Sequence, residues 1–299
     1  MTTVTATTAA AIDAFLAARK SRVSSTTLET DYTQLRRLSL ETLGLPLCDL
    51  TPAHLWAALT AHPHLALNTR KRMRITLKAF GKWAHQEGLT QVNLAADLPV
   101  PVAGVPPRAP RPFTWAELTQ TLEKITPTYR PLVEFAAHTG LRMGELSALR
   151  SEDLVLSSKV PHVSVTKSKT KLHPLKATKS GRSRRVPLDR AARRIARQQL
   201  VKAGPADLVF TGSRGGQIAS PNFRRDSGWA AAAPGRHFHD LRHTAAVHWL
   251  GIPEVAEADI QRWLGHKDLS QTQLYLSGLA VTRRDQALLS ALDKAVGHD

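Results

Sequence analysis

The sequence holds a single cysteine and no long apolar run, and each of these shortages excludes a class of protein. Cys48 has no second cysteine to pair with, which excludes an internal disulfide and a cysteine-based metal cluster. No stretch approaches the roughly 18 apolar residues of a membrane-spanning helix, and the first residues lack the charged-then-apolar order of a signal peptide. We therefore expect a protein of a reducing compartment, located in the cytoplasm and without a membrane partner.

Acidic residues are also scarce. The 299 residues include 24 acidic side chains against 41 lysines and arginines, a net charge of +17. Such a basic protein implies a polyanionic partner, most often nucleic acid. The excess is uneven, because residues 1–105 carry 11 basic and 7 acidic side chains and residues 106–299 carry 30 and 17.

The densest basic stretch, residues 159–197, holds 13 basic side chains and one acidic one. A run of this kind is often a disordered or solvated segment. The sequences HVSV and RRVPL inside it are typical of strands, so we predict a long basic β-hairpin instead.

A proline-rich segment divides the chain. Residues 100–112 contain five prolines and can form neither a helix nor a central strand, which is typical of a semi-rigid linker. We therefore predict one domain over residues 1–99 and a second over residues 113–299.

The residue pattern of the first domain is helical throughout. One helix is predicted from Thr26 or Thr27 to Gly44, another opens at Pro52, and a third covers residues 68–87. At helical spacing, the third helix carries a buried apolar stripe of Met73, Leu77, Phe80 and Ala84. A second, basic stripe is equally consistent with a DNA-facing surface and with an ordinary solvated face; its residues are Lys71, Arg74, Lys78 and Lys82.

The second domain alternates between helices and strands. Thr114 and Glu117 form a capping box, and a helix runs from Pro131 to Gly140. Another begins at about Leu141, the basic hairpin follows, and helices return afterwards. The predicted class is mainly α with a small β-sheet or hairpin, an α+β protein.

Two short motifs place arginines for phosphate binding. In HTGLRMGEL, Arg142 follows a glycine turn, and Glu145 lies three residues later on the same face, where it can hold the guanidinium. In HDLRHT, His239 and Arg242 are also three apart. Two arginines from distant segments suit the two non-bridging oxygens of a phosphodiester.

A third motif, RWLGHKDLSQTQLYLS, supplies a histidine after a glycine, His266, and a tyrosine nine residues on, Tyr275. A phenol can attack phosphorus if cations stabilise the charge and a base takes the proton. The leaving 5′ oxygen needs a general acid, and Lys179 in ATKSGRSRRVPL fits that role. Lys167 lies in a second TKS sequence and is the alternative.

Each of these residues has an ordinary structural interpretation when taken alone, such as a surface ion pair for Arg142 or packing for the histidines and the tyrosine. Metal binding is a further hypothesis, because His239 is suitably spaced from His237 and from His243. No cysteine or glutamate-flanked His-x-x-x-His pattern supports it. The joint occurrence of all six residues favours catalysis.

The order Arg, Lys, His-x-x-Arg, His, Tyr resembles the catalytic pattern of the tyrosine recombinase, or phage integrase, family. The matching residues are Arg142, Lys179, His239, Arg242, His266 and Tyr275, with Glu145 in support. The resemblance covers the whole chain, since LKAFGKWAHQEGLTQVN before the linker is similar to the family's helical, SAM-like core-binding domain. It implies a core-binding DNA-binding domain over 1–99 and a mixed α/β catalytic domain over 113–299.

The resemblance also implies a reaction. Tyr275 would attack the scissile phosphate to give a 3′-phosphotyrosyl intermediate, and a 5′ hydroxyl would then religate the strand. Arg142 and Arg242 would hold the non-bridging oxygens and His239 would shuttle a proton. His266 would assist at the phosphate, Lys179 would protonate the leaving oxygen, and neither a nucleotide nor a metal cofactor would be needed. Expected DNA contacts are Lys71, Arg74, Lys78, Lys82, Arg182, Arg184 and Arg185.

The implied partners are double-stranded DNA with a specific core site and other recombinase subunits, in a homotetramer or a heterotetramer with a related recombinase. A C-terminal helix would dock into the neighbouring subunit. The biological role would be Xer-like dimer resolution or integration and excision of a mobile element. Two alternatives remain open, a type IB topoisomerase-like enzyme that relaxes DNA and a non-catalytic DNA-binding regulator.

Overall fold

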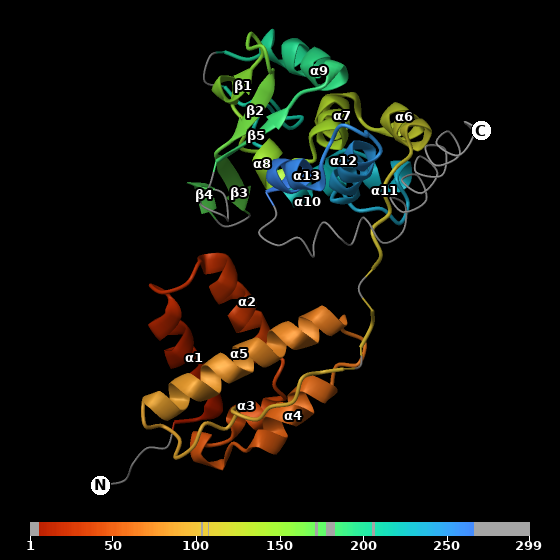
Figure 1. Cartoon of the computed structure of the whole chain (residues 1–299). Coiled ribbons are helices and arrows are strands. Elements are labelled where there is room, and N and C mark those ends of the chain that lie inside the picture. The colour runs from red at the N-terminus through yellow and green to blue at the C-terminus, as the bar shows by residue number, and fades with distance from the viewer. Residues whose placement is uncertain are drawn as a thin grey trace, which may run out of the picture. The chain divides into compact units, whose positions relative to one another are not determined.

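The computed structural model describes residues 6–102, 104–106, 108–170, 173–177, 183–204 and 207–265. The chain divides into two compact units, Met1–Ala109 and Pro110–Asp299. Figure 1 shows both units, and each is described by itself below. Within the described residues, no helix is both long and apolar enough to cross a membrane.

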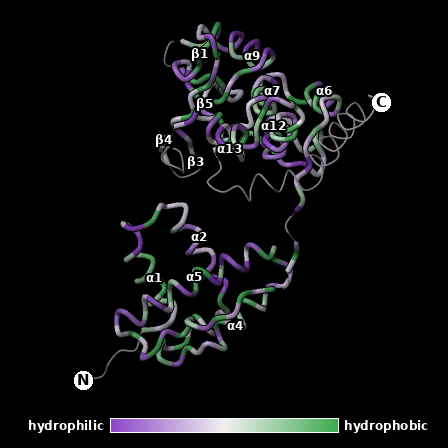
Figure 2. The backbone as a smooth tube through the Cα atoms, in the orientation of Figure 1, coloured by the Kyte–Doolittle hydropathy of each residue, from purple (hydrophilic) through white to green (hydrophobic). Residues whose placement is uncertain are grey.

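The described part of the first unit is helical. Its elements are α1 (Thr8–Arg19), α2 (Ser25–Leu35), α3 (Leu40–Gly44), a 3-10 turn (Leu47–Asp49), α4 (Pro52–Thr60) and α5 (Leu67–Gln86). The long helix α5 packs against α1, α2 and α4. Hydrophobic and hydrophilic residues alternate along it (Figure 2), as expected of a helix with one buried face.

The helix predicted from Thr26 or Thr27 to Gly44 is in fact two helices. Ser24 caps the first, because its hydroxyl oxygen accepts a hydrogen bond from the backbone N–H of Thr27 at 3.2 Å. Ser39 caps the second in the same way. An N-cap residue has extended backbone and therefore interrupts a helix, which is why the chain turns between α2 and α3.

The apolar stripe predicted on α5 is confirmed. Its four residues, Met73, Leu77, Phe80 and Ala84, are each no more than 1% exposed. The ring of Phe80 meets that of Phe15 from α1 edge to face, with the centroids 5.6 Å apart. The stripe and Phe15 are part of the hydrophobic core of the first unit.

A buried acidic residue also joins three helices of this unit. Asp31 on α2 is 1% exposed and pairs with Arg19 at 3.0 Å and with Arg72 at 3.3 Å. Thr76 on α5 donates a hydrogen bond of 2.8 Å to the same carboxylate. A buried carboxylate needs such partners, because desolvation without them costs several kcal/mol.

Part of the proline-rich segment is fixed to the first unit. Val105 bridges Ala66 as in a parallel strand pair, and the backbone N–H of Leu67 donates to the Val105 carbonyl at 3.0 Å. Val105, which lies inside the predicted linker, therefore pairs with the backbone of the first unit just before and at the start of α5.

The second unit combines helices with two small sheets, which confirms the α+β prediction. Its helices are α6 (Trp115–Lys124), α7 (Arg130–Thr139), α8 (Met143–Leu146), α9 (Arg190–Leu200), α10 (Ser220–Asp226), α11 (Trp229–Ala232), α12 (Asp240–Leu250) and α13 (Glu257–Leu264). Its strands are β1 (Leu154–Val155), β2 (His162–Val165), β3 (Lys167–Thr170), β4 (His173–Ala177) and β5 (Arg184–Pro187), and 3-10 turns cover Pro127–Tyr129 and Ser151–Asp153.

The basic hairpin differs from its prediction. Strands β2 and β5, the HVSV and RRVPL sequences, pair directly in antiparallel register with Val163 opposite Val186, and β1 extends this sheet. Between them, β3 and β4 form a separate antiparallel pair. The stretch is therefore a strand pair with an inserted second hairpin, instead of one long hairpin.

Helix α7 lies at the centre of the second unit. It contacts α12 most extensively and also packs on α6 and α9 (Figure 1). Its residues Val133, Phe135 and Ala136 are completely buried. The end of α7 therefore has a fixed position, and the candidate active site begins there.

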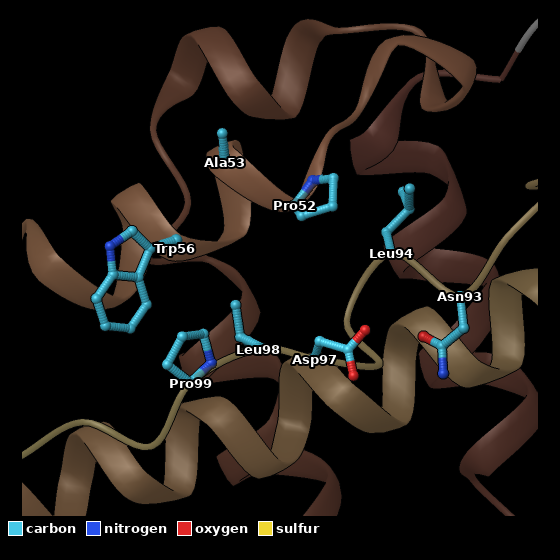
Figure 3. Close-up of a pocket in the computed structure, with 8 residues that line it drawn as sticks. All are labelled: Pro52, Ala53, Trp56, Asn93, Leu94, Asp97, Leu98 and Pro99. Carbon is cyan, nitrogen blue, oxygen red and sulfur yellow. The ribbon is translucent and has the colours of Figure 1, made fainter.

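A pocket of about 290 Å³ lies in the first unit between α4 and the segment that follows α5 (Figure 3). Trp56, Leu98 and Pro99 give it an apolar wall, and Asp97 adds a carboxylate. None of the candidate catalytic residues lines it.

Candidate active site

Arg142 and Glu145 form the pair that the sequence predicts. Arg142 lies directly before α8, and its Nη1 donates to Glu145 Oε1 at 3.0 Å. The backbone N–H of Arg142 donates to Oε2 of the same carboxylate at 2.8 Å. The Arg142 side chain is 41% exposed, whereas that of Glu145 is 2% exposed. A buried carboxylate therefore holds an arginine whose guanidinium reaches the surface.

Glu145 has a second, more buried partner. Arg184 Nη1 and Nη2 on β5 donate to Oε1 and Oε2 at 2.9 and 2.7 Å, a bidentate pair. The Arg184 side chain is 8% exposed. Burial alone would raise the pKa of Glu145, but the hydrogen bonds and charges of Arg184 and Arg142 hold it below its ordinary value of 4.5. Glu145 is thus a carboxylate shared by two arginines.

Arg184 is therefore not the exposed DNA contact that the sequence predicts. Its guanidinium points into the protein, and its neighbour Arg185 is exposed. The alternation of side chains along a strand explains the difference, because Arg184 lies on the same face of β5 as the buried Val186. The sequence RRVPL already shows this alternation, so the inward direction of Arg184 could have been predicted from it. Arg185 stays a predicted DNA contact.

Arg242 is the second arginine of the site and is 1% exposed. It projects from α12, and its Nη1 donates to the carbonyl of Gly140 at 2.8 Å. Its Nη2 donates to the carbonyl of Leu264, the last residue of α13, at 2.5 Å. Arg242 thereby connects the ends of α7 and α13, and the Gly140 carbonyl that it binds lies two residues before Arg142 in the chain.

Gly140 makes this junction possible. It ends α7 with a φ of +62°, a left-handed conformation that strongly favours glycine. A Cβ there would lie 2.9 Å from Leu264 Cδ2 and 3.3 Å from both Ala245 Cβ and Trp249 Cη2. The turn thus needs glycine both for its conformation and for the close packing of α7, α12 and α13.

His239 stands immediately before α12, and its side chain does not cap the helix. The residue is exposed overall, and its ring interacts with the charges of Arg142 and Arg242. Desolvation, together with the charges of His243, Arg242 and Arg142, lowers the pKa of His239 to about 4. The imidazole is therefore neutral near pH 7 and can accept a proton.

The metal-binding hypothesis gains no support from the described residues. His239 and His243 lie edge to face with their ring centroids 5.0 Å apart. Among the side chains that the structure describes, no group of three or more histidines, cysteines or acids is arranged to hold a metal ion.

Four of the predicted residues lie outside the described ranges: Lys179, Arg182, His266 and Tyr275. Lys167, the alternative to Lys179, is half exposed at the start of β3, and its Nζ lies 3.6 Å from Glu152 Oε1. The choice between the two lysines stays a prediction from sequence.

The basic stripe of α5 has two kinds of residue. Arg74 Nε donates to the carbonyl of Leu98, and Lys78 Nζ to that of Ala96, each at 2.6 Å. These two side chains hold the segment after α5 against the helix. Lys71 and Lys82 are exposed. All four stay predicted DNA contacts, with Lys71 and Lys82 the better placed.

The geometry of the second unit thus gathers a histidine and two arginines from segments about a hundred residues apart. The model of the phage integrase family matches residues 112–280, which is more than half of the chain. The chain belongs to the phage integrase family. It is a tyrosine recombinase, an enzyme that cleaves and rejoins DNA strands.

Curated relatives agree with this assignment. The chain is 28% identical over 282 residues to a protein named tyrosine recombinase XerC from Alcanivorax borkumensis, covering 83% of this chain and 88% of that protein. It is 30% identical over 248 residues to tyrosine recombinase XerC from Mycobacterium tuberculosis, covering 76% and 78%. Tyrosine recombinase XerD from Corynebacterium glutamicum is 28% identical over 270 residues, covering 79% of this chain and 81% of that protein.

Solved structures show the same fold. The Tn1549 transposon integrase, solved with a circular intermediate DNA, superposes with a TM-score of 0.73 at 17% identity, over 90% of this chain and 95% of that chain. A lambda integrase tetramer bound to a Holliday junction gives 0.69 at 20% identity, over 91% and 78%. At these identities the likeness supports the fold.

Proposed function

We propose that this recombinase acts at a specific DNA site with Tyr275 as its nucleophile. The phenol oxygen of Tyr275 bonds to the scissile phosphorus, the bond from phosphorus to the 5′ oxygen breaks, and a 3′-phosphotyrosine results. Attack by the 5′ hydroxyl of a partner strand reverses these steps and frees the tyrosine. The observation that carries the proposal is the meeting of Arg142, His239 and Arg242 at the end of α7.

The arginines supply charge to the transition state. Arg142 is surface-accessible and oriented by Glu145, so it can meet one non-bridging oxygen with little reorganisation. Arg242 supplies the second positive charge from a fixed, buried position. Preorganised cations in a partly desolvated site stabilise a growing negative charge far better than solvated ones do.

His239 is proposed to shuttle the proton of Tyr275. Because its pKa is lowered to about 4, the ring is in the accepting form before DNA binds. A phosphate anion placed between the arginines would offset their charges and raise that pKa towards neutrality. The base would thus become stronger when substrate is present.

The remaining roles rest on the sequence. Lys179, with Lys167 as the alternative, protonates the leaving 5′ oxygen, and His266 assists at the phosphate. The phosphotyrosine retains the energy of the broken bond, so the proposed reaction uses neither a nucleotide nor a metal cofactor.

The proposal extends to domains and assembly. Residues 1–99 form the core-binding domain, residues 100–112 the linker, and residues 113–299 the catalytic domain with its exchange helix. The working form on DNA is a tetramer, of this chain alone or with a related recombinase, located in the cytoplasm with its substrate. The XerC and XerD relatives favour dimer resolution as the role, and integration or excision of a mobile element is the alternative.

A covalent trapping assay tests the chemistry. Wild type is incubated without added metal on nicked duplexes that carry candidate sites, and adducts are resolved on a denaturing gel. We expect an adduct that is lost in Tyr275→Phe and retained in Tyr32→Phe, a matched control in the first unit. Relaxation of supercoiled DNA lacking any specific site would instead favour the topoisomerase alternative. Absence of an adduct on a site that the protein and its partner subunit bind would contradict catalysis.

A deletion tests the assembly. Removal of residues 290–299 takes away part of the proposed exchange helix, so we expect synapsis of two sites to fall more than binding to one site. Equal loss of both, measured on native gels, would contradict the exchange of this segment between subunits.

A further inference from the structure

Arg184 lies where three parts of the proposed site meet. Its two Nη atoms hold Glu145, which also holds Arg142. Its Nε donates to the carbonyl of Trp263 in the last turn of α13 at 2.7 Å. The side chain of Arg184 is thus connected both to the first catalytic arginine and to the helix that precedes His266.

A close backbone contact strengthens the second connection. Gly265 ends α13 with a φ of +66°, and a Cβ there would lie 3.0 Å from Arg184 Cδ and 3.2 Å from its Nε. Gly265, the residue before His266 in the chain, therefore lies close against the Arg184 side chain. Arg184 also begins β5, only five residues after Lys179 in the chain.

Burial separates this residue from the basic residues around it. The Arg184 side chain is 8% exposed and donates hydrogen bonds to three protein oxygens, whereas Arg185 beside it is exposed. An arginine used in this way cannot also meet a phosphate without breaking a buried bidentate ion pair, a costly change.

We propose that Arg184 is a positioning residue for strand cleavage. It holds Glu145, and through it Arg142, at a fixed position relative to the end of α13, and so sets the distance between the phosphate-binding arginine and the helix that precedes His266 in the chain. This inference rests on the proposed function and adds a residue that acts through others.

Two substitutions separate positioning from DNA contact. Arg184→Lys keeps the charge but loses the planar fork, and Arg184→Met keeps the length without charge. On a suicide substrate, we expect the cleavage rate of the fully bound complex to fall roughly 10- to 100-fold in both variants, because small misplacements of catalytic groups have effects of that size. DNA affinity and its dependence on salt should match wild type.

The matched comparison is Arg185→Met, which should weaken DNA binding and reduce the salt slope by about one. If Arg184→Lys instead behaves in this way, with unchanged cleavage at saturating protein, the residue is a DNA contact and the proposal is overturned.

A double-mutant cycle separates positioning from a general loss of structure. Because Arg184 acts through Arg142, its substitution should slow cleavage several-fold less in an Arg142→Lys background than in wild type. An equal fold reduction of the cleavage rate in both backgrounds would overturn the proposal.

Hydrogen exchange of the full chain gives a readout that does not depend on activity. We expect faster exchange at the amides of Arg142 and Gly265 in Arg184→Met, or in Arg184→Lys if the former does not fold. If wild type forms no Tyr275-dependent adduct, the proposed function fails while this measurement still decides the positioning role. Unchanged protection at both amides would overturn it.

Discussion

Replacing Gly140 with alanine tests the junction on which the site is built. The residue has a φ of +62°, and an added Cβ would lie 2.9 Å from Leu264 Cδ2. Its carbonyl accepts a hydrogen bond from Arg242. The substitution therefore strains the backbone, overfills the contact between α7 and α13, and displaces a catalytic arginine.

The expected loss can be estimated from two contributions. A left-handed conformation in a residue other than glycine costs about 1–2 kcal/mol. Overpacking in a well-packed interior costs about 1–3 kcal/mol more. Gly140→Ala should thus lower the free energy of unfolding by about 2–5 kcal/mol, the sum of these estimates.

Gly215 provides the matched control, because its φ is +76° and a Cβ there would meet nothing within 4 Å. Gly215→Ala should cost only the backbone strain, about 1–2 kcal/mol. Urea unfolding followed by tryptophan fluorescence measures both variants, and Trp249 lies at the Gly140 contact. Equal losses for the two variants would refute the packing argument.

Three further predictions concern charged groups. Glu145→Gln should lower the free energy of unfolding by about 3–5 kcal/mol, because it leaves Arg184 buried without its carboxylate partner. The pKa of Glu145 in the folded protein lies below 4.5, so the ion pair stabilises wild type above that pH and is lost as the pH falls. Acid unfolding of the variant should therefore depend less on pH than that of wild type. The pKa of His239 is about 4 in wild type and should rise in Arg142→Gln, because the charge of Arg142 helps to lower it. It should not rise in the control Arg185→Gln, and histidine proton resonances measure both variants. An unchanged pKa in Arg142→Gln would contradict the effect of the Arg142 charge. Asp31→Asn should cost about 3–5 kcal/mol, whereas Asp13→Asn, which removes an exposed pair with Arg36, should cost under about 1 kcal/mol; similar melting temperatures would contradict this contrast.

The sequence predicted local features well because they depend on neighbouring residues. The apolar stripe of α5, the capping box at Thr114 and the pairing of HVSV with RRVPL each follow from spacing within one or two segments. The Arg142–Glu145 pair is likewise separated by three residues only.

Features that depend on distant segments were not predictable in the same way. Nothing in the motif around Arg242 indicates that its guanidinium is buried against the carbonyls of Gly140 and Leu264. The division of the first predicted long helix depends on whether Ser39 caps a helix or continues one, which packing decides. Arg184 is an intermediate case. Strand alternation indicates its inward direction, but the basic residues around it led to the prediction of a DNA contact.

The most direct test of the account is to identify the amino acid that carries the DNA. The chain has three tyrosines, of which Tyr129 is 1% exposed and Tyr32 is 48% exposed. Trapped adducts would be digested with nuclease and protease, and the residual nucleotide located by mass spectrometry. The account predicts a phosphodiester on Tyr275 alone; a link to Tyr32, or to a residue other than tyrosine, would contradict it.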